Sequence, residues 1–115
     1  MKALFPAVIR APFAAYAHGV EVPPGARLVV TSGQLAARPD DSVPEGALEQ
    51  ARLCLANCAA SPAEAGMGPP DVIRINAFVT DRAHMKGYMQ ARDEWLRGVA
   101  RLPASTLVIV AGFTR

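Results

Sequence analysis

The feature that most constrains the fold is an apolar run close to the end of the sequence. Residues 107–110 read Leu-Val-Ile-Val, directly after Ser105 and Thr106. A strand whose apolar residues do not alternate with polar ones is expected to be buried on both faces. The sequence offers two helices, which can cover only one face of a small sheet. We therefore expect another copy of the chain to cover the other face.

Two segments have the spacing of apolar residues that is typical of amphipathic helices. The first spans Glu45–Gly66, and Pro62 within it removes one backbone donor. We expect a kink there, or a second helix that begins with Ser61 as its cap. The other segment runs from residue 80 to about residue 99, with a capping side chain at position 80 or 81.

Strand patterns occupy the first third of the chain and two later segments, one of them the apolar run. The clearest is Asp71–Thr80, whose odd positions are all apolar, so one of its faces should pack on helices. Pro6 weakens the first early candidate, which belongs at a sheet edge. Pro-Pro-Gly-Ala at residues 23–26 marks a turn between the next two. The early candidates are residues 3–10, 16–22 and 27–32.

The order of these elements predicts an α+β domain whose two helices lie on one side of a sheet. The chain has 115 residues, the length of one domain, so we assign residues 1–115 to a single unit. Charged residues make up 19% of it, against about 25% in an average domain. Either the abundance of alanine or the burial of surface between subunits explains this, and we favour the second.

Charge and hydropathy exclude some classes of protein. The net charge is +2 and the basic residues are scattered, which argues against a nucleic-acid partner. No apolar run reaches the roughly 20 residues of a membrane span. Pro6 and Arg10 interrupt the N-terminal segment before a signal-peptide core could form. We therefore expect a cytoplasmic protein without a membrane partner.

Residue types that bind metals or react occur without a recognisable pattern. Cys54 and Cys58 lie four apart on one helix face, a spacing unsuited to a disulfide, so we interpret them as packing groups. A zinc site would need further ligands at suitable spacing, and His18 and His84 do not supply them. We expect no metal and no cofactor. The sequence also lacks a phosphate-binding loop and a nucleophile elbow.

Small polar residues gather instead at the ends of the predicted strands. They are Tyr16, the segment Thr31–Gln34, Ser105 and Thr106. Strand ends at a sheet rim or a subunit boundary are common ligand sites. The same hydroxyls could equally satisfy backbone groups in turns. Their spacing alone leaves both interpretations open.

Five stretches, in the same order along the chain, resemble the RidA family, also called YjgF and formerly endoribonuclease L-PSP. They are APFAAYAHGV, VVTSGQL, LEQARLCLANCAASPAEAG, DVIRINAFVTD and LPASTLVIV. The resemblance implies a chorismate-mutase-like fold, with two helices on one face of a mixed sheet. It also implies a homotrimer in which the sheets form a central barrel and small-molecule clefts lie between subunits. The matching ligand-binding positions are Tyr16, Ser32, Gly33, Ser105, Thr106 and Leu107.

Active members of this family hydrolyse reactive enamines and imines, and an arginine binds the substrate carboxylate. Ser105 stands at that arginine's position and Met89 at that of a family asparagine. The family's late glutamate would lie beyond Arg115, in a final strand that we expect a longer chain to contain. The resemblance implies an enamine or imine deaminase. The alternatives are a metabolite-binding or partner-binding trimer without turnover, and the ribonuclease or translation inhibitor of the older family label.

Overall fold

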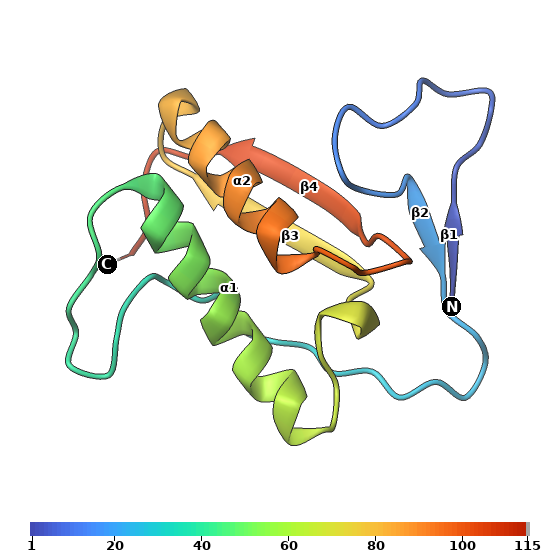
Figure 1. Cartoon of the computed structure of the whole chain (residues 1–115), viewed down its shortest axis with the longest axis horizontal. Coiled ribbons are helices and arrows are strands. Elements are labelled where there is room, and N and C mark those ends of the chain that lie inside the picture. The colour runs from blue at the N-terminus through green and yellow to red at the C-terminus, as the bar shows by residue number, and fades with distance from the viewer. Residues whose placement is uncertain (115) are drawn as a thin grey trace.

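The computed structural model describes residues 1–114 and consists of two helices and two small sheets (Figure 1). Short 3₁₀ turns precede the first of the two long strands and the second helix. Within the described residues, no helix has both the length and the apolar composition that are needed to cross a bilayer. In chain order the elements are β1 (Lys2–Leu4), β2 (Gly19–Glu21), α1 (Ala47–Glu64), η1 (Pro69–Asp71), β3 (Arg74–Val79), η2 (Arg82–His84), α2 (Met85–Trp95) and β4 (Ala104–Ile109).

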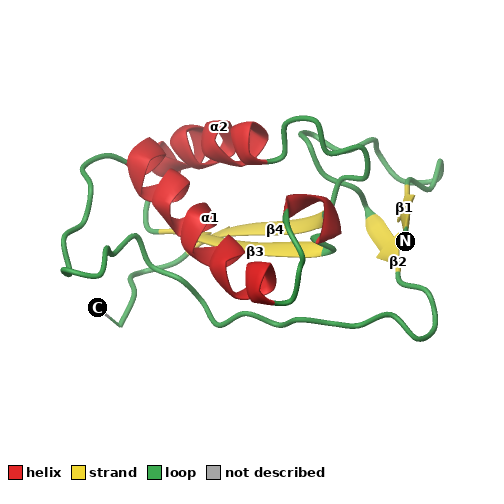
Figure 2. Ribbon diagram, turned by 60° about the horizontal axis from the view of Figure 1, so that its bottom comes forward, coloured by secondary structure: helices red, strands yellow, loops and turns green. Residues whose placement is uncertain are grey.

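The strands β3 and β4 form a parallel pair, and both helices lie on the same side of it (Figure 2). The alternation of apolar residues explains this arrangement, because Ile75, Ala77 and Val79 turn toward the helices while the residues between them are exposed. The register runs from Arg74 opposite Ala104 to Val79 opposite Ile109. The predictions of an α+β fold and of helices on one face are confirmed.

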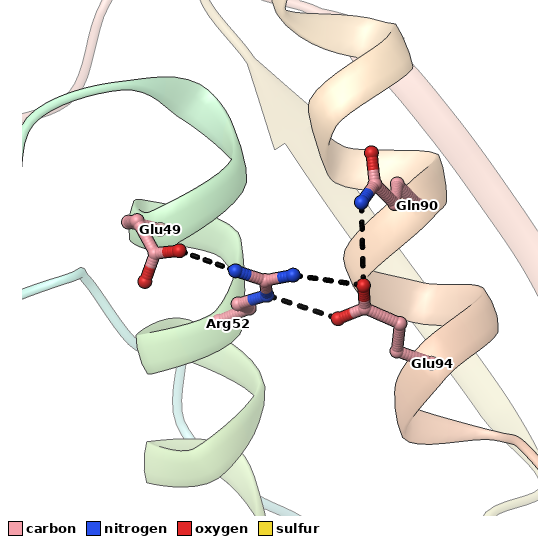
Figure 3. A network of polar contacts seen from close by, with 4 residues as sticks. All are labelled: Glu49, Arg52, Gln90 and Glu94. Carbon is pink, nitrogen blue, oxygen red and sulfur yellow. Dashed lines mark hydrogen bonds and ion pairs between the residues drawn. The ribbon is translucent and has the colours of Figure 1, made fainter.

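The core lies between this sheet and α2. Tyr88 packs on Ala77 and Val79, and Met85 and Met89 contact the same cluster. The apolar stripe of the second helix is therefore a core stripe, as its spacing indicates. The helices themselves are joined at their exposed edges by a network of polar side chains (Figure 3).

The helix ends differ from the prediction. The first helix continues through Pro62 to Glu64, so of the two alternatives at Pro62, a kink or a restart, the restart at Ser61 was wrong. Pro62 lies in the last turn, where it removes one intrahelical hydrogen bond, and the helix ends two residues later. The second begins after η2, where Asp81 Oδ1 accepts from the Ala83 backbone N–H at 2.8 Å. It ends at Trp95, before the expected residue 99, and the chain reverses at Gly98, whose φ is 80°.

The N-terminal third contains less strand than its sequence predicts. The strands β1 and β2 pair antiparallel over three residues each, and β1 ends before Pro6. Residues 27–32 form no strand, so this prediction was wrong. They run along the side of β3 that faces away from β4, where Val30 is 91% exposed (Figures 1 and 2). Apolar β-branched residues favour a strand only where a neighbouring strand pairs with them.

The expected single mixed sheet is also divided. Its two parts are the β1–β2 hairpin and the β3–β4 pair, which one isolated bridge connects. The face of β3 and β4 opposite the helices carries no second layer formed by residues 1–114 (Figure 2). On this open face Phe78 is 55% exposed and Val108 is 39% exposed. The protomer thus leaves uncovered the apolar surface for which the sequence predicts a partner layer.

Candidate functional site

One backbone contact brings two of the predicted site segments together. The Ala17 N–H donates to the Pro103 carbonyl at 2.9 Å, and Ala17 forms an isolated parallel bridge with Ala104. The hairpin therefore lies at the end of the sheet where β4 begins (Figure 1). Tyr16 and Ser105 are each one residue away from this bridge. Residues from opposite ends of the chain thus meet at one rim of the fold.

Tyr16 is half-buried at this rim and is held by its own loop. Its hydroxyl oxygen accepts from the Phe13 N–H at 3.3 Å, so the hydroxyl hydrogen remains free to donate to another group. The ring lies edge-to-face against His18, with 6.1 Å between centroids. His18 Nε2 donates to the Arg10 carbonyl at 2.6 Å. His18 lies two residues after Tyr16, in the stretch APFAAYAHGV that carries part of the family resemblance, but no role in the site was predicted for it.

The three candidates on β4 do not share one face. By register Ser105 lies beside Ile75 and Leu107 beside Ala77, on the side of the helices. Thr106 is exposed on the open face, where its Oγ1 accepts from the Arg74 guanidinium at 2.5 Å. A ligand on one face of the sheet can therefore contact the side chains of Ser105 and Leu107, or the side chain of Thr106, but not all three.

Ser32 is the last of residues 27–32, and Gly33 follows it in the same exposed segment, which continues to Leu35. This segment is attached to α1, since Asn57 Nδ2 donates to the Leu35 carbonyl at 3.1 Å and Cys54 Sγ to the Gln34 carbonyl at 3.6 Å. Among residues 1–114 no hydrogen bond joins this segment to the tyrosine or to β4. The protomer alone does not bring all six candidates into one pocket.

Two hollows lie on the helical layer. An open groove of about 740 Å³ follows the exposed side of α2 between Arg82 and Arg97, and a smaller one lies between the two helices. Neither is lined by Tyr16 or by any β4 residue. The charged residues along the larger groove are of both signs, and their arrangement indicates no particular ligand.

The two cysteines are free thiols, which agrees with the packing interpretation. Burial raises the pKa of Cys54 and of Cys58 above the ordinary value for a thiol. Both therefore stay protonated at neutral pH, and a protonated thiol is a poor nucleophile and metal ligand.

The comparisons with a family model and with solved structures point to the same family. The family model described as Endoribonuclease L-PSP matches residues 8–114. The structure of YyfB from Yersinia pestis, a protein of unknown function in the conserved Rid family, has a TM-score of 0.82 at 21% identity, over 99% of this chain and 88% of that one. A comparison with curated proteins gave no match.

Two structures from E. coli resemble the chain over its whole length. TdcF with bound serine has a TM-score of 0.72 at 26% identity, and the YjgF gene product has 0.72 at 25%. Each comparison covers 100% of this chain and 90% of the other. Since the family model spans residues 8–114 and these structures share the fold, the chain belongs to the RidA/YjgF family, whose model carries the description endoribonuclease L-PSP.

Proposed function

We propose that the protein is a homotrimer that binds small molecules derived from amino acids in clefts between subunits and hydrolyses reactive enamines or imines. Family membership supports this proposal, and TdcF, a structural neighbour at 26% identity, binds serine. The observation that carries the site is the Ala17–Ala104 bridge, because it joins the Tyr16 loop to the beginning of β4.

The open face of the sheet supports the assembly. Phe78 and Val108 lie side by side on it by register, and both are exposed in the protomer. Apolar residues of adjacent strands on a face without a second layer are typical of a surface that another subunit covers. Copies of the same chain present the same surface, which a closed symmetric assembly can bury.

The reaction consumes water and releases ammonia. An enamine first takes a proton on carbon to give the imine, whose C=N carbon is electrophilic. Water adds to this carbon, its proton passes to nitrogen, the C–N bond breaks and ammonia leaves as the carbonyl forms. No oxidant, reductant or metal is needed, so the protein has to orient the imine and position one water molecule.

The residues near the bridge suit these tasks. Tyr16 orients the ligand with its free hydroxyl hydrogen. Ser105 of the same subunit and Ser32 of a neighbouring subunit donate hydrogen bonds to the ligand. A backbone carbonyl near Leu107 accepts from the attacking water. The Ser32 loop reaches the bridge only through assembly, because within one protomer it is attached to α1.

Release of ammonia from a freshly generated imino acid tests the reaction. The full chain should accelerate release over buffer, and Tyr16→Phe and Ser105→Ala should slow it. Ser61→Ala, an exposed serine on α1, should leave the rate unchanged. A wild-type rate equal to that of buffer would remove the enzymatic proposal for carboxylate substrates.

Ser105 favours a second candidate, a trimer that binds a metabolite without turning it over. A serine hydroxyl offers one uncharged donor where the family's arginine offers a charged fork for a carboxylate. This candidate predicts saturable binding without ammonia release. Ser105→Arg separates the two, because gained deaminase activity would show a competent site that lacks only its charged group.

A further inference from the structure

Tyr16 lies at the end of a long loop that strand pairing holds only at its two ends. The loop comprises residues 5–16, between the end of β1 at Leu4 and the bridge formed by Ala17 (Figure 1). Long loops are the parts of a domain in which several conformations compete. The orientation of the Tyr16 hydroxyl therefore depends on contacts between loop residues and a fixed part of the fold.

His18 belongs to that fixed part. Ala17, the residue before it, is 1% exposed and forms the bridge to Ala104. Gly19, the residue after it, is the first residue of β2 and pairs with Leu4. Strand pairing thus holds the backbone on both sides of the histidine, and its imidazole provides a fixed point against which the loop is placed.

A closed network of contacts leads from His18 through the loop to Tyr16 and back. His18 Nε2 donates to the Arg10 carbonyl at 2.6 Å, across eight residues of sequence. The Arg10 guanidinium carbon lies 3.9 Å from the centroid of the Phe13 ring. The Phe13 N–H donates to the Tyr16 hydroxyl oxygen at 3.3 Å, and the Tyr16 ring lies at 82° to the His18 ring. The network holds the tyrosine both at its hydroxyl and at its ring.

We propose that His18 is a positioning residue for the Tyr16 hydroxyl and that it acts on the reaction through this tyrosine. The inference rests on the proposed function, in which Tyr16 orients the ligand. A carbonyl oxygen can only accept, so the hydrogen of the bond to Arg10 lies on Nε2. Neutral imidazole with this hydrogen and imidazolium both donate from Nε2, so the network forms in either protonation state.

Ammonia release from the imine of pyruvate, generated in situ, measures the effect on the reaction. His18→Ala removes the donor and the ring together. It should lower kcat about tenfold or more, with a smaller change in KM, because a small displacement of an orienting group has a large effect on rate. A change in KM with kcat unchanged would overturn the proposal.

A double variant tests whether the histidine acts through the tyrosine. In the Tyr16→Phe background, His18→Ala should lower kcat by less than about twofold further, because the effects of residues in one network are not additive. The same loss as in the wild-type background would overturn the proposal. His84→Ala removes the other histidine, which is exposed on η2, and should keep the wild-type rate. Equal losses in the two alanine variants would also overturn it.

Conservative variants separate the hydrogen bond from the ring contact. His18→Gln places an amide N–H at the same number of bonds from Cβ as Nε2, and should recover most of the rate that His18→Ala loses. His18→Phe keeps a ring without a donor and should remain close to the alanine variant. The opposite order would overturn the bond to Arg10 as the contact that holds the loop. Equal thermal midpoints in these variants would exclude loss of folding as the cause.

Hydrogen exchange of the Phe13 amide, measured by NMR, tests the positioning without turnover. This amide donates to the Tyr16 hydroxyl, so its exchange should accelerate in Tyr16→Phe. It should accelerate similarly in His18→Ala and stay close to the wild type in His18→Gln. Acceleration in Tyr16→Phe but not in His18→Ala would overturn the role of His18. Failure of the wild type to release ammonia would overturn the proposed reaction instead, and would leave the exchange result intact.

Discussion

Arg52 on α1 donates two hydrogen bonds to Glu94 on α2, from Nε to Oε2 at 2.9 Å and from Nη2 to Oε1 at 2.8 Å (Figure 3). Arg52 also pairs with Glu49, and Gln90 Nε2 donates to Glu94 Oε1 at 3.3 Å. A bidentate contact of this kind fixes the relative position of the two helices. Its strength depends on the charge of the carboxylate, and hence on pH.

The hydrogen bonds from Arg52, and then from Gln90, hold the pKa of Glu94 at about 2, below its ordinary value of 4.5. The pair therefore contributes its full stability above the pKa of the unfolded chain, and this contribution is lost as pH falls from about 4.5 to about 2. Glu94→Gln should lower the thermal midpoint slightly at pH 7, since exposed pairs contribute little. Thermal melts of both proteins between pH 2 and pH 7 should converge at the acid end.

Glu64→Gln provides the matched control, because Glu64 is exposed on α1 and forms no ion pair among residues 1–114. Its melting profile should follow that of the wild type at every pH. A difference between wild type and Glu94→Gln that stays constant down to pH 2 would contradict the role assigned to the pair.

Gly87 on α2 lies directly against the first turn of α1. A Cβ at this position would lie 2.9 Å from the Leu48 backbone nitrogen and 3.2 Å from the Ala47 Cβ. Alanine is favoured over glycine in a helix by about 1 kcal/mol, but overpacking costs about 1–3 kcal/mol. Because one of the contacting atoms is backbone, Gly87→Ala should be net destabilising, by about 1–2 kcal/mol in urea unfolding.

Gly112→Ala is the comparison for this variant, since a Cβ there meets no atom within 4 Å and the backbone needs no positive φ. Its free energy of unfolding should stay close to that of the wild type. A Gly87→Ala protein that is more stable than the wild type would show that the two helices separate at no cost.

Tyr88 is 8% exposed, and its hydroxyl has no hydrogen-bond partner among residues 1–114. Burial raises the pKa of this phenol, so the group is neutral at physiological pH. The Arg92 guanidinium lies 5.8 Å from the centroid of the Tyr88 ring. Phenylalanine at position 88 would keep this contact, because it keeps the ring. An unpartnered buried polar group costs about 1–3 kcal/mol. Tyr88→Phe should therefore leave chemical stability unchanged or raise it by up to about 1 kcal/mol.

Loss of the whole ring should have a much larger effect. Tyr88→Ala removes the central side chain of the core cluster and should cost about 3–5 kcal/mol, the range for large aromatic residues. Unfolding of both variants in urea measures the contrast. If the phenylalanine protein lost as much stability as the alanine protein, the hydroxyl would have to make a bond that the structure does not contain.

The sequence predicted those parts of the fold that depend on local periodicity. The alternation in residues 71–80 identified β3 and its inner face, and helical spacing identified α1 and α2. Residues 27–32 have the composition of a strand, but strand formation needs a partner, which local pattern does not reveal. The contact between Ala17 and Ala104 is likewise tertiary and has no local signal.

For the candidate site, too, the sequence predicted local features and missed the tertiary ones. Motif similarity indicated Tyr16 and Ser105, and the structure brings their segments to one rim. Strand alternation already puts Ser105 and Thr106 on opposite faces, but only the tertiary structure shows that Ser105 is the one on the side of the helices. The hydrogen bond from Arg74 to Thr106 likewise has no local signal, because only the pairing of β3 with β4 places the two side chains next to each other.

The open sheet face provides the test of the proposed assembly. Phe78→Lys places a charge at the centre of the apolar surface that the proposed trimer buries, where an unpaired charge is strongly unfavourable. Sedimentation equilibrium of the wild type should give three times the chain mass of 12.1 kDa, and the variant should shift toward a single chain. Val43→Lys, in the exposed loop before α1, adds the same charge elsewhere and should keep the wild-type mass. A wild-type protein that sediments as a single chain at micromolar concentration would contradict the assembly, because the apolar face would then be stable in water.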